Sequence, residues 1–215
     1  MVIVGADCTG HGVPGAFMSM LGVTLLNEEL EGTSLVKPNE ILGRLRMKVK
    51  DMLAQEGHIK DQKDGMDMAF VLIDKEKHEL QFAGANYPLY LIRTKEHAGG
   101  KALDPYLSIE NSQYKLYELK GDKQPIGIHW QETDFTNHVI KLEEQDSLYI
   151  FSDGILDQYG GDRRKKYKAF NFRKLLLSIQ SEHMEIQKCS IMDAFEAWRG
   201  KHEQIDDVSV IGLRV

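Results

Sequence analysis

The hydrophobic pattern of this chain changes its period near residue 64, and this change limits the folds open to it. Before it, apolar residues recur every three or four positions at residues 17–25 and 41–52, the spacing of helices that bury one face. After it, three short apolar runs between residues 68 and 92 are separated by polar or glycine-proline turns, as in antiparallel strands. Helices and strands in blocks that do not alternate predict the α+β class rather than a parallel βαβ sheet.

Strand patterns also occur outside that central block. Residues 139–142 and 147–151 look like the two arms of a hairpin, and residues 95–113 have so little pattern that we expect a loop there. The remaining predicted strands lie at residues 2–7, 114–119 and 208–215.

Further helices are predicted at about residues 171–181 and 190–199. Ser190, with Asp193 three residues later, resembles a capping box at the start of the second of these. In the first helix of the chain we expect the stripe of Phe17, Met20 and Leu21 to face the core. Dimerisation explains the two N-terminal helical stripes equally well, so a homodimer stays open.

Length and composition predict one sizeable soluble domain. The chain has 215 residues, of which 42% are hydrophobic and 28% are charged. A net charge of −6 argues against nucleic-acid binding, and the basic run at residues 163–166 is typical of a solvated loop. Cys8 and Cys189 form neither a disulfide framework nor a zinc motif. With no signal peptide or membrane-spanning stretch, we expect a cytoplasmic domain without membrane insertion, although its parent protein could be tethered to a membrane.

Three carboxylates stand at the ends of predicted strands. Asp7 and Asp153 each follow an apolar run, and Asp206 precedes one. Carboxylates collected at strand ends, beside glycines that let the backbone approach a ligand, suit a hard divalent cation such as Mg²⁺ or Mn²⁺. The pattern therefore favours metal-assisted hydrolysis.

Six short motifs carry a resemblance to a known family. They occur in one order along the whole chain: ADCTGHGVPGA at residues 6–16, DGMD at 64–67, AGANYPLY at 83–90, QPIG at 124–127, SDGILD at 152–157 and DDVSV at 206–210. A single Asp-Gly pair after a strand is normally a hairpin turn, whereas the ordered set is specific. Together the motifs resemble the PPM-type (protein phosphatase 2C-like) serine/threonine phosphatase domains of bacteria, the RsbU/SpoIIE-like family.

The resemblance implies a sandwich of two mainly antiparallel β-sheets flanked by α-helices, formed by residues 1–215 as a single domain. It also implies a site for two Mn²⁺ or Mg²⁺ ions. In the family's pattern Asp7 bridges both metals and the backbone carbonyl of Cys8 is a further ligand. Asp153 and Asp206 complete the coordination of one of the metals. Asp207 remains an alternative to Asp206 as the ligand.

The implied activity is hydrolysis of phosphoserine or phosphothreonine by a water that the metals activate. The implied partner is a phosphoprotein substrate, for example an anti-sigma-factor antagonist. Four residues are candidates for supporting roles around the metals, each with a plain structural alternative such as a turn, a cap or a loop. They are His11, Asp67, Asp157 and Asp207.

One departure from the family pattern concerns the N-terminus. The family carries another metal-binding Asp in a strand upstream of the one that ends at Asp7, and this chain begins six residues before Asp7. We therefore expect an N-terminally truncated family domain that lacks its first strands. The rival hypothesis is a non-catalytic or degenerate signalling module that binds a phosphoprotein partner. A third, a hydrolase of small phosphate esters, differs from the first only in its substrate.

Overall fold

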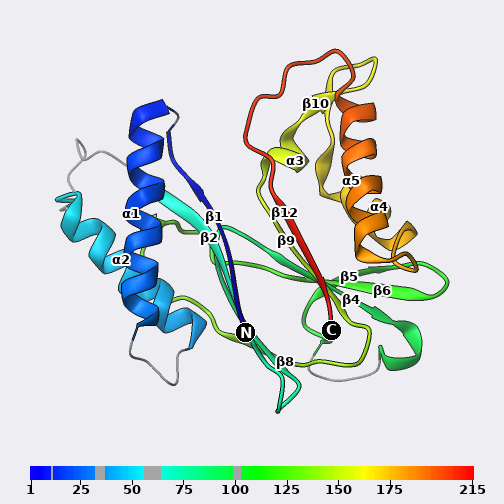
Figure 1. Cartoon of the computed structure of the whole chain (residues 1–215), viewed down its shortest axis with the longest axis horizontal. Helices are drawn as coiled ribbons and strands as arrows, with labels where there is room; N and C mark the ends of the chain where they lie inside the picture. The colour runs from blue at the N-terminus through cyan, green and yellow to red at the C-terminus, as the bar shows by residue number, and fades with distance from the viewer. Residues whose placement is uncertain (11, 32–36, 56–63, 99–102) are drawn as a thin grey trace. The chain divides into compact units, whose positions relative to one another are not determined.

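The computed structural model describes residues 1–10, 12–31, 37–55, 64–98 and 103–215, and it divides into two compact units (Figure 1). Unit 1 consists of Met1–Pro88 and Lys120–Lys141, and unit 2 of Leu89–Leu119 and Leu142–Val215. Each unit contains an antiparallel sheet and helices, which confirms the predicted α+β class. No helix in the described part of the chain has the length and apolar character needed to cross a bilayer.

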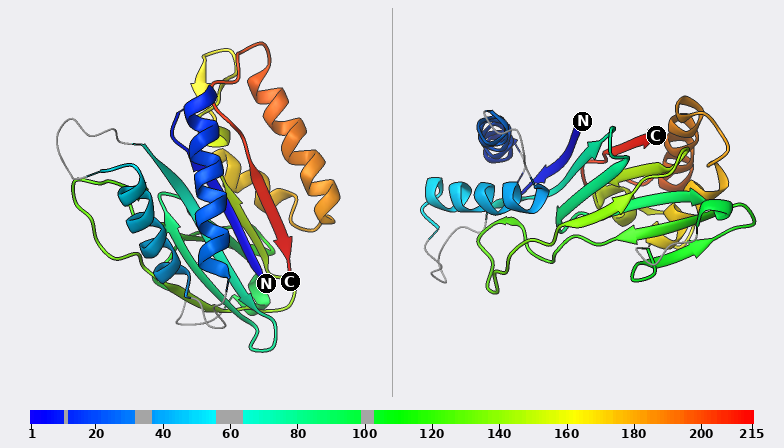
Figure 2. Two further views of the ribbon diagram at one scale, coloured as in Figure 1. Left: turned by 60° about the vertical axis from the view of Figure 1, so that its left-hand side comes forward. Right: turned by 90° about the horizontal axis from the view of Figure 1, so that it is seen from below.

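Unit 1 is built on a sheet with the strand order β1-β2-β3-β8. All of its pairings are antiparallel, and a short strand, β7, pairs with the start of β2. Figure 2 shows the sheet with two helices, α1 and α2, lying over one of its faces. The elements of unit 1 are β1 (Val2–Cys8), α1 (Gly12–Leu30), α2 (Pro38–Met52), β2 (Gly65–Asp74), β3 (Glu79–Ala85), β7 (Ile126–Gly127) and β8 (His138–Lys141).

The helix α2 follows the predicted pattern over most of its length. Its predicted apolar stripe is buried from Ile41 to Val49 and packs in one core with Phe70 of β2, whereas Met52 at its end is exposed. Pro38 stands at the first turn, where the missing N–H costs no helical hydrogen bond.

The prediction that Phe17, Met20 and Leu21 of α1 face the core is wrong. Phe17 and Met20 are exposed, and Leu21 is only partly buried. The face that packs inward carries Met18 and Leu25 together with two glycines and a glutamate; the complete set is Gly15, Met18, Gly22, Leu25 and Glu29. The glycines explain the choice of face, because a Cβ at Gly22 would lie only 3.0 Å from Met66 Sδ of β2.

Unit 2 is built on a second antiparallel sheet, with the order β12-β9-β4-β6-β5. The helices α4 and α5 pack against it, and a small hairpin of two further strands follows α3. The elements of unit 2 are β4 (Leu89–Thr94), η1 (Lys95–His97), β5 (Leu107–Glu110), β6 (Tyr114–Leu119), β9 (Ser147–Phe151), α3 (Gly154–Asp157), β10 (Tyr159–Gly160), β11 (Lys165–Lys166), α4 (Lys168–Ser178), α5 (Met184–Arg199) and β12 (Val210–Arg214).

Three local predictions are wrong in this part of the chain. The expected hairpin does not form, because β8 pairs with β3 while β9 pairs with β4 and β12. The region expected to be a loop contains β5, which pairs with β6. Ser190 lies inside α5 rather than at its start, where His183 stands at the N-cap position.

Candidate functional site

In unit 1 the candidate residues gather where β1 and β2 meet. Asp7 stands directly opposite Asp67 in the antiparallel register of the two strands. Residues opposite each other in such a pair project to the same face of the sheet, with Cβ atoms about 4.5–5.5 Å apart. Asn86 Nδ2 donates a hydrogen bond of 2.7 Å to Asp67 Oδ1. The structure therefore brings Asp7 and Asp67 together on one face.

The turn after Asp7 is fixed by two hydrogen-bonded features. Thr9 N donates to Gly65 O at 3.0 Å, and Gly65 N donates to Thr9 Oγ1 at 2.9 Å, so the end of β1 is clamped to the start of β2. Gly10 has a φ of 92°, and a Cβ on Gly15 would lie 2.6 Å from Gly10 O. Both glycines are thus required by the backbone. His11, the other candidate in this turn, lies outside the described residues.

Cys8 is half-buried, and burial raises the pKa of its thiol; the negative charge of Asp7 also raises it, against a lowering by a hydrogen bond with Ser19. A thiol with a raised pKa stays protonated near neutral pH and is a poor metal ligand or nucleophile. The thiol of Cys8 is therefore unsuited to either role, and the contribution of its backbone carbonyl stays a prediction.

In unit 2, Asp153 is positioned by its neighbour Ser152. Ser152 N donates to Ser209 O at 3.1 Å, Ser152 Oγ donates to Asp207 O at 2.9 Å, and Ser209 N donates to Ser152 Oγ at 2.9 Å. Gly154 completes the contact, because a Cβ there would lie 2.3 Å from Asp207 O. The turn after β9 is thereby held against the segment that carries Asp206.

The electrostatics of this part of unit 2 favour a cation. Burial raises the pKa of Asp153, and the charges of Asp206 and Asp157 raise it further. Lys166 partly offsets them, and its Nζ lies 2.7 Å from Asp157 Oδ2. Asp153 occupies the N-cap position of α3 yet makes no side-chain capping bond, so the capping alternative is not supported. Carboxylates that repel one another in this way are stabilised by a bound divalent cation.

The structure places the candidates in two groups, each in one unit. Asp7, Cys8 and Asp67 belong to unit 1. Among the described residues, no three or more His, Cys, Asp or Glu side chains form a group that could hold a metal ion. The candidates in unit 2 are Asp153, Asp157, Asp206 and Asp207.

Sequence reasoning missed the residues that hold these carboxylates in place. Thr9 and Ser152 act through partners about 55 residues away in the chain. Lys166, which the pattern assigned to a solvated basic run, pairs with Asp157. The available signal was local: each hydroxyl residue lies within two positions of a candidate aspartate.

Comparisons with known proteins agree with the predicted family and fold. A family model described as stage II sporulation protein E (SpoIIE) matches residues 1–215. The SiaA PP2C domain of Pseudomonas aeruginosa is 27% identical with a TM-score of 0.81, over 100% of this chain and 75% of that one. The PP2C phosphatase domain of SpoIIE from Bacillus subtilis, solved with a fragment of its regulatory domain, is 16% identical with a TM-score of 0.70, over 99% and 54%.

A third solved structure is the catalytic domain of the serine/threonine phosphatase PstP in complex with two manganese ions. It is 15% identical, with a TM-score of 0.60, over 100% of this chain and 87% of that one. Likenesses at 15% and 16% identity show the fold alone. Comparison with curated proteins finds no match.

Proposed function

Because the chain belongs to the stage II sporulation protein E (SpoIIE) family, we propose that it is a metal-dependent serine/threonine phosphoprotein phosphatase of bacterial signalling. The observation that carries the proposal is the turn at Asp153. Burial and two neighbouring carboxylates raise the pKa of this aspartate, and Ser152 clamps it to the segment of Asp206. The repulsion among these carboxylates costs stability unless a cation binds them, and such an arrangement is typical of a functional site.

We assign the metal ligands to four residues. The donor set, carboxylate and carbonyl oxygens, suits Mn²⁺ or Mg²⁺. When bound, such ions lower the pKa of water and stabilise negative charge on phosphoryl oxygens. The ligands we propose are Asp7, the carbonyl of Cys8, Asp153 and Asp206.

The roles of the chain's other residues follow from their contacts. Asn86 holds Asp67 by its hydrogen bond, and Asp67 faces the same side of the sheet as Asp7. Lys166 orients Asp157, which in turn contributes to the negative field at Asp153. We propose that these residues orient the ligands rather than bind the substrate.

The proposed substrate is a phosphoserine or phosphothreonine on a bacterial signalling protein such as an anti-sigma-factor antagonist, in the cytoplasm. The likeness of the whole chain to regulatory phosphatase domains supports this class. A fold alone does not fix a substrate, so the choice of partner rests on the family resemblance.

The test is phosphate release from a phosphoserine peptide across a Mn²⁺ titration, using the wild type, Asp7→Asn and Asp153→Asn. Asp104→Asn is the matched control, because Asp104 is exposed and belongs to unit 2. We expect metal-dependent turnover in the wild type and in the control. In each ligand variant, turnover should fall by more than the roughly 10–100-fold that is lost when a residue hydrogen-bonded to a metal ligand is removed. The circular dichroism spectrum should stay unchanged.

Retained turnover in Asp153→Asn would refute the assignment of the ligands. A wild type without turnover at any Mn²⁺ concentration, but with metal-independent binding of a phosphoprotein, would replace the proposal by the non-catalytic module.

A further inference from the structure

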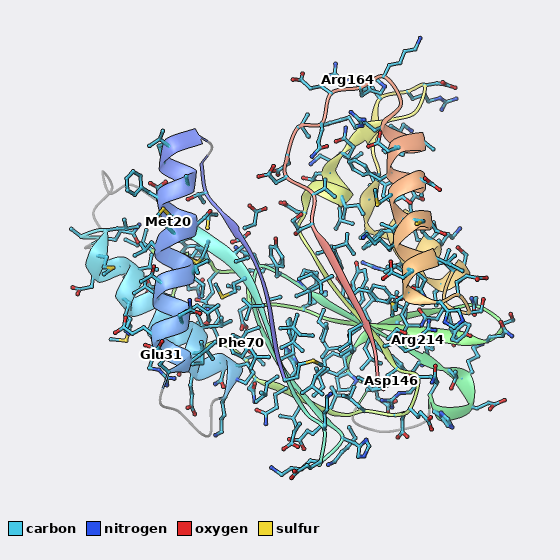
Figure 3. All side chains as sticks on the ribbon, viewed as in Figure 1. Met20, Glu31, Phe70, Asp146, Arg164 and Arg214 are labelled. Carbon is cyan, nitrogen blue, oxygen red and sulfur yellow. The ribbon has the colours of Figure 1, made fainter. Side chains whose placement is uncertain are left out.

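A basic hairpin lies beside the candidate aspartates of unit 2. It is formed by β10 and β11, and Figure 3 labels Arg164 in the turn between them. Three neighbouring residues of this hairpin, which we call the basic tip, are Arg163, Arg164 and Lys165. All three are exposed, and within the described ranges none of them forms an ion pair. In a chain with a net charge of −6, the basic tip is therefore a concentration of free positive charge.

Contacts with the end of α5 hold this hairpin in place. Gly161 N donates to Trp198 O at 3.0 Å, and Trp198 Nε1 donates to Gln158 O at 3.0 Å. A Cβ on Gly160 would overlap Trp198 O, so the two backbones approach each other as closely as glycine allows. The ring of Trp198 also meets the ring of Tyr167 edge-on. A hairpin tethered in this way presents its charges at a fixed place, which lowers the entropy cost of binding.

Lys166, the next residue of the basic run, connects the basic tip with the candidate site. Its Nζ lies 2.7 Å from Asp157 Oδ2, and its charge partly offsets the rise in the pKa of Asp153 that burial causes. Asp157 follows Asp153 by one turn of α3, which is about 6 Å. From Lys166 to Arg164 the chain spans at most about 7 Å. An extended peptide whose phosphorylated residue lies beside Asp153 therefore needs about four residues to reach the basic tip.

We propose that the basic tip binds acidic residues of the phosphoprotein substrate, about three to five positions from the phosphorylated residue. This inference rests on the proposed phosphatase function and adds the chemistry of its substrate, a phosphoserine or phosphothreonine with Asp or Glu nearby. Arg163 and Arg164 suit this task, because a guanidinium holds a carboxylate with two parallel N–H donors.

Charge complementarity supports this occupant. The charges of Asp206 and Asp157 act on Asp153, so this part of unit 2 has a negative field of its own. Metal ions at the site would offset that field for the phosphate group, whereas carboxylates farther along the substrate need a positive surface of their own. A patch of one sign that meets a patch of the other speeds the encounter and fixes the register of the bound chain.

The number of charges favours a peptide over a membrane or a nucleic acid. Basic clusters that recognise anionic lipids contain roughly 4–8 Lys or Arg residues, and nucleic-acid binding needs a basic face of larger extent. The basic tip has three free cations, and Asp162 beside it removes part of their charge. Three cations match the two or three carboxylates of a short acidic segment.

Binding of peptides that cannot be hydrolysed tests the basic tip apart from catalysis. The full chain with Mn²⁺ is titrated against labelled peptides in which a phosphonate replaces the phosphate ester of the phosphoserine. One peptide carries aspartates three to five positions away on both sides, and the other carries asparagines there. Fluorescence anisotropy should show about tenfold tighter binding of the aspartate peptide, the size expected of two or three exposed ion pairs.

Substitutions then locate the preference. Arg163→Glu should abolish it. Lys188→Glu is the matched control, because Lys188 is exposed, receives the same reversal of charge and lies about 15 Å from Trp198 along α5. The double variant Arg163→Glu, Arg164→Glu should instead prefer a peptide with lysines in place of the aspartates.

The outcomes separate this proposal from the proposed function. Equal binding of the aspartate and asparagine peptides by the wild type, or equal effects of Arg163→Glu and Lys188→Glu, would overturn the assignment of the basic tip. Phosphatidylserine vesicles or single-stranded RNA whose binding depends on Arg163, without any preference among the peptides, would assign the surface to that partner instead. If the phosphatase proposal alone fails, neither phosphoserine peptide is turned over while the preference in binding persists. If this proposal alone fails, both are turned over without preference.

Discussion

Replacing Asp146 with alanine should be among the most damaging single substitutions in unit 2. Asp146 lies in the turn before β9, and its side chain is fully buried. Arg93 Nε donates to Asp146 Oδ1 at 2.9 Å, and Arg93 Nη2 donates to Oδ2 at 2.6 Å. Glu143 N donates to Oδ2 at 2.9 Å. The carboxylate thus accepts two charge-assisted bonds and one backbone bond in a buried place (Asp146 is labelled in Figure 3).

The expected loss is about 3–5 kcal/mol of the free energy of unfolding, because removing Asp146 deprives the buried charge of Arg93 of both hydrogen bonds to the carboxylate. Arg93 is only 6% exposed, so solvent cannot replace the missing carboxylate. For a chain of this size 1 kcal/mol corresponds to about 2–4 °C in melting temperature. The midpoint of unit 2 should therefore fall by about 6–20 °C.

The two tryptophans allow unit 2 to be observed separately. Trp130 belongs to unit 1 and Trp198 to unit 2. Trp198 Nε1 donates to Gln158 O at 3.0 Å, and its ring lies edge-on to Tyr167, so its fluorescence should change on unfolding. In a Trp130→Phe background, fluorescence during guanidinium unfolding then reports on unit 2.

Two further variants test whether the buried charge of Arg93 causes this loss of stability. Glu110→Ala breaks the exposed pair of Glu110 with Lys95, whose charged atoms lie 2.9 Å apart. This substitution should leave the free energy of unfolding unchanged within the error of the measurement. Replacing both buried partners, with Arg93→Met and Asp146→Leu, should recover most of the loss, because no buried charge remains. If Asp146→Ala were as stable as Glu110→Ala, or the double variant no better than the single one, the argument from desolvation would be refuted.

Two other substitutions have expected outcomes. Gly154→Ala should destabilise unit 2 by more than about 1 kcal/mol and reduce turnover, since its Cβ would meet Asp207 O at 2.3 Å. In contrast, Gly43→Ala, with no heavy atom within 4 Å of the new Cβ, should stabilise α2 by about 0.5–1 kcal/mol. Burial raises the pKa of Tyr149 from 10.0 to about 12. Its folded form therefore holds the proton more tightly, so this contribution of up to about 3 kcal/mol is full below pH 10 and is lost as the pH rises towards 12.

Each of these has its own measurement. Denaturant unfolding compares Gly154→Ala with Gly43→Ala, and equal effects of the two would contradict the close contact at Gly154. Tyrosinate absorbance in the wild type and in Tyr149→Phe follows the phenol, and a difference that titrates near pH 10 would contradict its burial.

The periodicity of apolar residues predicted which helices and strands form better than it predicted what each of them packs or pairs with. The strands β2, β3, β4 and β6 have a clear pattern because they are short apolar runs of strand length, and the helix α2 because it buries a single stripe. The stripe of α1 was misassigned because this helix is apolar on both sides, so the pattern alone could not say which side packs. Only the glycines at positions 15 and 22 distinguish the inner face.

The false hairpin has a related cause. Residues 143–146 have the length and polarity of a turn, and local alternation carries no information about which strand each arm pairs with. Asp146 looked like a turn residue, yet its partner Arg93 lies 53 positions away. The candidate aspartates were recognisable from local motifs, while the clamps by Thr9 and Ser152 depend on contacts across the fold.

The division of the chain into its two units has a consequence for how the protein can be synthesised and dissected. Unit 1 receives β7 and β8 only after the chain has passed through β4, β5 and β6 of unit 2. Its sheet therefore cannot be completed until residue 141 has left the ribosome, by which time β4, β5 and β6 of the other sheet have already been synthesised. No single cut can release either unit whole, so a fragment ending at residue 88 should expose the edge of β3 on which β8 pairs and aggregate through it.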